Sequence, residues 1–165
     1  MSHIPTTLDH VALDVANRDR SAEFYAALLG ARPIAEDPEH HITFLRLPGS
    51  SRFSDIALHE HPDRDAAYPK GQMRLAHTGW AVDRAQYLVD AFEFFTEHSR
   101  VLLAADFGVS LSVMGADPDG NVVEFELFDH SARDAEPGFS VLDLDLLRER
   151  VATSSPFVRG GSTPR

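Results

Sequence analysis

An internal repeat constrains the fold of this chain more than any other feature of its sequence. Residues 8–15 and 75–82 carry Leu, His and Val at matching positions, at an offset of 67 residues. Apolar and polar side chains alternate in both segments, which predicts strands. At the same offset Tyr25 aligns with Phe92, so the repeat continues into the segment that follows each strand. The sequence therefore predicts two copies of one supersecondary unit.

Each copy has the pattern of a strand, a helix and three further strands. Apolar spacing predicts helices over residues 18–29, ended by Gly30, and from an N-cap at Asp83 through Phe95. The later strands are expected at residues 32–36, 41–47 and 55–61, and at residues 101–105, 110–116 and 121–128. Asp117 to Asn121, with the sequence DPDGN, predicts a hairpin turn. The expected fold class is α+β, with two paired βαβββ modules that form a curved mixed sheet around a central cleft.

The domain organisation follows from the same pattern. Modules at residues 7–61 and 74–129 are expected to form a single domain within residues 1–130, joined by a polar linker at residues 61–72. Residues 131–165 are expected to hold a short helix, over residues 141–151, and a mobile tail from Thr153 that is rich in Ser, Gly, Pro and Thr.

Composition limits the chemistry that the chain can carry. It has nine histidines and no cysteine, so disulfides, thiolate metal sites and cysteine nucleophiles are excluded. The formal charge of −11 argues against a nucleic-acid partner. No apolar run approaches the length of a membrane span and the start of the sequence is unlike a signal peptide, so we expect no membrane partner and a cytoplasmic location.

Three polar residues stand out because of the face on which alternation places them. His10 and His77 occupy the same position in the two copies, on the face away from the helices, and Glu124 lies on the polar face of the last strand. If two equivalent modules pair into a trough, these residues could converge. Two imidazoles and one carboxylate form a facial set that binds Fe(II) and leaves positions open for substrate.

Over about residues 7–129 the chain resembles the vicinal oxygen chelate superfamily, which includes glyoxalase I, type I extradiol dioxygenases, fosfomycin resistance enzymes and bleomycin resistance proteins. The resemblance is carried by the segments LDHVALDV, SAEFYAALLG, LAHTGWAV and DPDGNVVEFE. It implies paired βαβββ modules, a homodimer, and a metal site with His10, His77 and Glu124 as ligands.

The resemblance also bears on the reaction. The lyases and isomerases of the superfamily add a fourth ligand, usually Glu or Gln, from the last strand of the first module. Here Ala57 and His59 bracket that position, so a four-ligand set is disfavoured unless His59 binds. The extradiol dioxygenases use three ligands, and His59 resembles their acid or base. Phe107 and Met114, assigned to the substrate pocket, stand where those enzymes commonly have a His and a Tyr.

These features favour a divalent-metal-dependent, extradiol-dioxygenase-like oxidoreductase that acts on a small aromatic substrate, with His59 as a catalytic acid or base. Fe2+ is the expected cofactor, and Mn2+, Zn2+, Ni2+ and Co2+ are alternatives. Two other functions remain open. One is a glyoxalase-type lyase or isomerase acting on a small carbonyl compound. The other is a non-catalytic protein that binds a small molecule such as an antibiotic, which the apolar Phe107 and Met114 favour.

Overall fold

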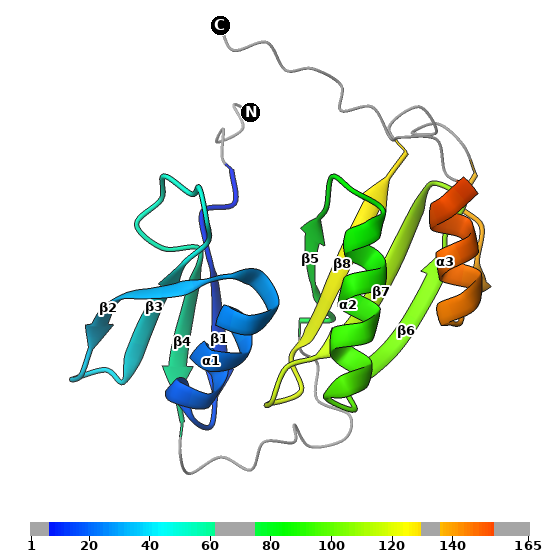
Figure 1. Ribbon diagram of the computed structural model, residues 1–165. Helices are drawn as coiled ribbons and strands as arrows, with labels where there is room; N and C mark the ends of the chain where they lie inside the picture. Colours follow the sequence, from blue (N-terminus) through cyan, green and yellow to red (C-terminus); the bar gives the residue numbers. More distant parts are fainter. Residues whose placement is uncertain (1–6, 62–74, 130–135, 154–165) are drawn as a thin grey trace, which may run out of the picture. The chain divides into compact units, whose positions relative to one another are not determined.

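The computed structural model describes residues 7–61, 75–129 and 136–153, which form two compact units (Figure 1). Unit 1 comprises residues 1–72 and 118–120, and unit 2 comprises residues 73–117 and 121–165. Most of the predicted linker and the tail beyond Thr153 lie outside the described residues. Each unit contains a sheet with helical cover, and the α+β class is confirmed.

Unit 1 is a four-stranded sheet covered on one face by a helix (Figure 1). Its sheet order is β1-β4-β3-β2, in which β1 runs parallel to β4 and the other neighbours are antiparallel. The elements are β1 (Val11–Val15), α1 (Arg18–Leu29), β2 (Arg32–Asp37), β3 (Ile42–Arg46) and β4 (Ile56–Glu60).

Local sequence sets both ends of α1, whose bounds agree with the prediction. At the start, the Asn17 side chain accepts a hydrogen bond from the backbone N–H of Arg20 at 2.8 Å, as an N-cap does. At the end, Gly30 has a φ of 66°, the left-handed conformation that glycine adopts without strain. Phe24 and Tyr25 are buried beneath the helix. The helix thus covers the apolar face of the sheet and leaves the opposite face open.

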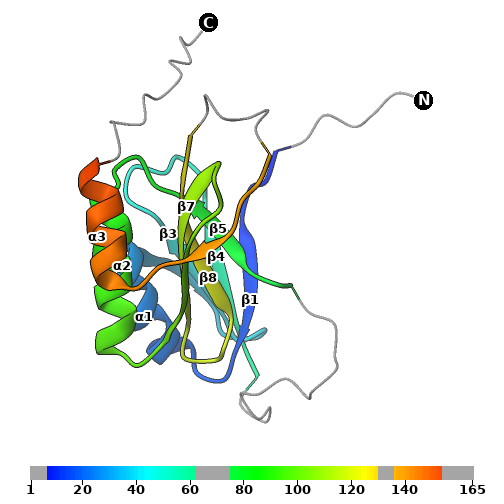
Figure 2. The same cartoon turned by 90° about the vertical axis from the view of Figure 1, so that its right-hand side faces the viewer.

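Unit 2 repeats this plan and extends it. Its sheet order is β5-β8-β7-β6-β9, with β5 parallel to β8 and the other neighbours antiparallel. Two helices, α2 and α3, pack against each other on the same side of this sheet (Figure 2). The elements are β5 (Thr78–Ala81), α2 (Gln86–Glu97), β6 (Val101–Asp106), β7 (Ser110–Ala116), β8 (Val122–Phe128), β9 (Ser140–Val141) and α3 (Leu144–Thr153).

The helix-covered face of unit 2 is identified by a close approach between α2 and β7. A Cβ added to Gly115 would lie 2.2 Å from Cδ1 of Phe95, so the ring rests directly on the glycine. Phe95 is fully buried and its ring lies 6.2 Å from that of Phe125 in β8. By alternation, Ser112 and Glu124 belong to the opposite, open face. The predicted N-cap at Asp83 is wrong, because α2 begins after Ala85 and has no side-chain cap.

The C-terminal segment packs on unit 2 as part of its fold. The helix expected over residues 141–151 occurs as α3, and β9 before it pairs with the outer edge of β6. Leu147 of α3 is fully buried, and Arg150 donates to the Asp106 carboxylate from Nε at 2.8 Å. Burial opposes ionisation of Asp106, but hydrogen bonds from the Gly108 N–H and Arg150 outweigh it and lower the pKa.

Candidate metal centre

The open face of unit 2 brings two of the predicted ligands into contact. His77 immediately precedes β5, and its Nε2 lies 2.9 Å from Oε2 of Glu124 in β8. The Glu124 side chain is 6% exposed, whereas the His77 imidazole is 42% exposed. A buried carboxylate therefore meets an imidazole that solvent and small molecules can reach.

Strand register explains this contact. β5 and β8 are parallel, and Gly79 pairs with Glu124. His77 is two residues before Gly79, so its side chain projects to the same face. The absence of a side chain at Gly79 leaves the space between imidazole and carboxylate open, since an added Cβ would lie 3.8 Å from Glu124 Oε2.

Two serines of β7 hydrogen-bond the two carboxylates of β8. Ser112 donates from Oγ to Oε1 of Glu124, and Ser110 donates from Oγ to Oε1 of Glu126 at 2.8 Å. Burial raises the pKa of Glu126, the hydrogen bond from Ser110 opposes that rise, and the negative charge of Glu124 adds to it. The open face thus concentrates acidic oxygen atoms beside one imidazole.

The facing atoms of His77 and Glu124 have the spacing of two ligands of one metal ion. Nitrogen and oxygen ligands that bind at about 2.1 Å and at right angles are separated by about 3.0 Å. The observed Nε2 to Oε2 distance is 2.9 Å. Imidazole nitrogen with carboxylate oxygen is also a donor set suited to iron, manganese and zinc. These two residues fit a divalent metal ion, which would take the place of the proton between them.

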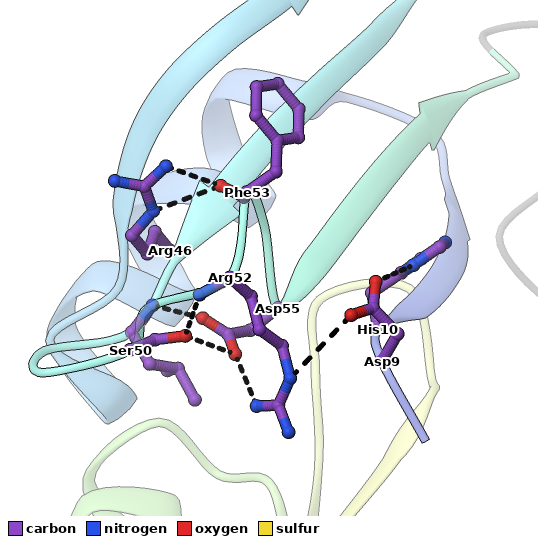
Figure 3. A network of polar contacts seen from close by, with 8 residues as sticks. Asp9, His10, Arg46, Ser50, Arg52, Phe53 and Asp55 are labelled. Carbon is purple, nitrogen blue, oxygen red and sulfur yellow. Dashed lines mark hydrogen bonds and ion pairs between the residues drawn. The ribbon is translucent and has the colours of Figure 1, made fainter. Parts of the chain in front are cut away.

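The third predicted ligand, His10, belongs to unit 1, and the structure describes each unit by itself. It immediately precedes β1, and its Nδ1 lies 3.1 Å from the Asp9 carboxylate (Figure 3). A carboxylate at one ring nitrogen is the arrangement that orients metal-binding histidines, since it leaves the other nitrogen for the metal.

A network of polar contacts continues from Asp9 to the loop before β4. Arg52 lies 3.9 Å from Asp9 and donates to Asp55 at 3.1 Å (Figure 3). Burial opposes ionisation of Asp55, but hydrogen bonds from the Leu47 N–H, Ser50 and Arg52 outweigh it and hold the pKa below its ordinary value. The permanently negative Asp55 thereby positions Arg52 beside Asp9.

Register identifies the position in unit 1 that corresponds to Glu124. Ala12 pairs with Ala57 in β1 and β4, as Gly79 pairs with Glu124 in β5 and β8. Both members of the second pair follow the first at the repeat offset of 67 residues. Ala57, not a position between Ala57 and His59, is therefore the equivalent of Glu124. Unit 1 offers no carboxylate at this position.

The predicted acid or base His59 corresponds to Glu126 by the same register. It pairs with Asp14 of β1, as Glu126 pairs with Ala81 of β5. His59 is half-buried and shares its face of β4 with Ala57. Its place beside the equivalent of the metal-ligand position is compatible with proton transfer.

The two residues predicted to line the substrate pocket have different surroundings. Met114 pairs with Glu124 across β7 and β8, so it lies on the open face beside the candidate ligands. Phe107 lies in the turn between β6 and β7, where its ring is 5.7 Å from that of Phe139. The structure thus places Met114, and not Phe107, next to the His77 and Glu124 pair.

Sequence reasoning missed Ser112, Ser110 and Asp9. Alternation in residues 110–116 puts both serines on the face that carries Glu124, which was the available signal. Only the strand register shows which carboxylate each one reaches. Within residues 7–61, 75–129 and 136–153, no group of three His, Asp or Glu side chains is arranged to hold a metal ion.

Comparison with protein families gives a match over residues 7–125 to the glyoxalase/bleomycin resistance protein/dioxygenase superfamily. The comparison with curated proteins finds no match. Solved structures with the same fold are numerous, and three examples show the range of their described functions.

A glyoxylase/bleomycin resistance protein/dioxygenase domain from Frankia sp. EAN1pec has 18% identity and a TM-score of 0.65, over 77% of this chain and 95% of that one. A fosfomycin resistance protein from Listeria monocytogenes has 16% identity and a TM-score of 0.60, over 79% and 99%. A lactoylglutathione lyase from Agrobacterium tumefaciens has 20% identity and a TM-score of 0.55, over 74% and 94%. At these identities the likeness shows a shared fold.

Proposed function

Since the chain belongs to the glyoxalase/bleomycin resistance protein/dioxygenase superfamily, we propose that it is a divalent-metal-dependent enzyme in which His10, His77 and Glu124 are the ligands. The observation that carries this proposal is the 2.9 Å contact between His77 Nε2 and the buried Glu124 Oε2. A buried carboxylate facing an accessible imidazole is costly to retain without a function for the pair.

The reaction we propose is an extradiol-dioxygenase-like oxidation of a small aromatic substrate. Ala57 supports it, because the first unit has no carboxylate at the position equivalent to Glu124 and so supplies no fourth acidic ligand. Three protein ligands leave room on the metal for a chelating substrate and for O2. Bound Fe2+ would supply the Lewis acid and the O2-reactive centre.

The remaining chemistry falls to residues of the chain. His77 and Glu124 hold the metal, and Met114 offers an apolar surface beside Glu124 for a substrate ring. His59 would accept a proton from the substrate hydroxyl at a ring nitrogen, since an imidazole titrates near neutral pH. Homodimer formation is part of the proposal, as is a cytoplasmic location. Among the described helices, none is long and apolar enough to span a membrane.

Metal analysis of protein purified without an affinity tag tests this proposal. Wild type and His77→Ala are compared with the control His40→Ala, because His40 is an exposed histidine that contacts Asp37 at 2.9 Å, away from Glu124. We expect stoichiometric iron in wild type and in the control, and almost none in His77→Ala. A folded wild type that holds no metal and cannot be reconstituted would contradict the proposal.

Oxygen uptake then separates the reactions. The iron-loaded protein is given a panel of catechols under air, and we expect consumption of O2 with at least one of them. A lyase or isomerase would bind metal and convert a carbonyl compound with no O2 uptake. A protein that only sequesters a small molecule would bind a compound of the panel and leave it unchanged.

A further inference from the structure

We propose that Ser112 is a positioning residue that makes Glu124 a one-oxygen ligand, with Oε1 held by the serine and Oε2 presented to the metal. This inference rests on the proposed metal site and adds a function for a residue that contacts no other candidate ligand. A carboxylate can bind a metal through one or both oxygens, and the choice alters the number of positions left for substrate.

The two oxygens of Glu124 have different partners in unit 2. Oε1 accepts a hydrogen bond from Ser112 Oγ, and Oε2 lies 2.9 Å from His77 Nε2. An ionised carboxylate can only accept, so the serine hydroxyl must be the donor. Its single proton is directed at Oε1, and rotation of the carboxylate toward two-oxygen binding would break this bond.

Burial strengthens the restraint. Ser112 is 1% exposed and Glu124 is 5% exposed, so water has little access to replace the hydroxyl. A charge-assisted hydrogen bond in a desolvated place is stronger than a neutral one at the surface. Met114, the direct cross-strand partner of Glu124, has no proton to donate. The diagonal neighbour Ser112 therefore determines the orientation of the carboxylate.

A second serine and glutamate pair provides a matched control. Ser110 lies two residues before Ser112 on the same face of β7 and donates to Glu126 Oε1 at 2.8 Å. Ser110 is also buried, at 5% exposure. Replacing either serine by alanine removes one hydroxyl and one hydrogen bond to a glutamate. Only the loss at residue 112 concerns the carboxylate that faces His77.

The test measures Zn2+ and Co2+ affinity by competition with a chelator, on the full-length protein. We expect Ser112→Ala to bind both ions about 10- to 100-fold more weakly than wild type, the range for loss of a group that orients a ligand. Ser110→Ala should remain within about threefold of wild type, because it leaves the Glu124 hydrogen bond intact. Ser112→Thr keeps the hydroxyl and should restore most of the affinity.

A spectroscopic measurement separates orientation from general loss of stability. The visible absorption of the Co2+ form depends on the number and geometry of its ligands. We expect this spectrum to change in Ser112→Ala and to be the same as wild type in Ser110→Ala. Circular dichroism establishes that each variant is folded, and Ser112→Gly removes the same hydroxyl if the alanine variant does not fold.

The outcomes distinguish this inference from the proposed function. Wild-type binding that is lost in His77→Ala but unchanged in Ser112→Ala overturns the role of Ser112 and leaves the metal site standing. Equal losses in Ser112→Ala and Ser110→Ala also overturn it. If folded wild type binds neither ion, the metal site fails and the role of Ser112 fails with it.

Discussion

His10 and His77 occupy equivalent positions of the repeat, yet their side chains have different partners. His10 contacts its neighbour Asp9, whereas His77 contacts Glu124, which is distant in sequence. Residue types and alternation were sufficient to select both histidines and the carboxylate. They could not show that Ser112 restrains Glu124 or that Ala57 is its equivalent, because those facts depend on strand register.

Two glycines of unit 2 should respond oppositely to alanine. Gly115→Ala would place a Cβ 2.2 Å from the buried Phe95 ring, so we expect the free energy of unfolding to fall by about 3 kcal/mol through overpacking. Gly79→Ala would meet only Glu124 Oε2, at 3.8 Å, and should change it by less than about 0.5 kcal/mol. Urea denaturation measures both. Equal stability of the two variants would contradict this packing of α2 on β7.

Elements with strong local signals were predicted accurately, and those that depend on tertiary contacts were not. The bounds of α1 and β7 agree with the sequence prediction, helped for α1 by Gly30 at its C-terminal end. The start of α2 was misplaced, since an acidic residue near a helix start is a weak signal when no backbone N–H receives it. The two-residue β9 is too short for a periodic pattern and exists because β6 offers an edge.

Neighbouring leucines of α3 test whether this helix contributes to the core of unit 2. Leu147 is fully buried, and truncation to alanine should lower the free energy of unfolding by about 2–4 kcal/mol. Leu146 is 48% exposed, so Leu146→Ala is the matched control, with an expected change below about 0.5 kcal/mol. Thermal and urea unfolding give the values. Similar small effects in both variants would mean that α3 does not pack on α2 in solution.

At the scale of the whole chain, the sequence predicted the number of modules, their order of elements and the helix-free faces. This succeeded because the repeat offset of 67 residues holds from β1 and β5 through to β4 and β8. Periodicity within a module carries no information on how one module meets another. For that reason the assembly of His10 with His77 and Glu124 stays a proposal.

Buried carboxylates determine how the stability of the protein responds to acid. The pKa of Asp55 is lower in the folded chain than its ordinary value of 3.8, so its ionised form stabilises the fold above that pH. This contribution should be lost as the pH falls below about 3.8 through the lower folded pKa. Wild type should therefore lose stability in that range.

Asp55→Asn tests this cause. We expect the variant to be less stable than wild type at pH 7 by about 1–3 kcal/mol, because the hydrogen bonds and Arg52 lose their ionised acceptor. The difference should shrink as the pH approaches 3. The control Asp37→Asn removes an exposed carboxylate that contacts His40, and should have a smaller effect. Parallel stability curves for wild type and Asp55→Asn across this range would refute the assignment.

The pairing of β9 with β6 also bears on how the protein avoids self-association. Without β9, the backbone groups of Ala105 and Asp106 would face solvent along an open strand. Leu102, 57% exposed near the other end of β6, would add an apolar contact for a second chain. Open, apolar strand edges recruit further strands and lead to aggregation. Two residues of β9, anchored by Leu147 and Arg150 of α3, cover this edge and so serve solubility as well as stability.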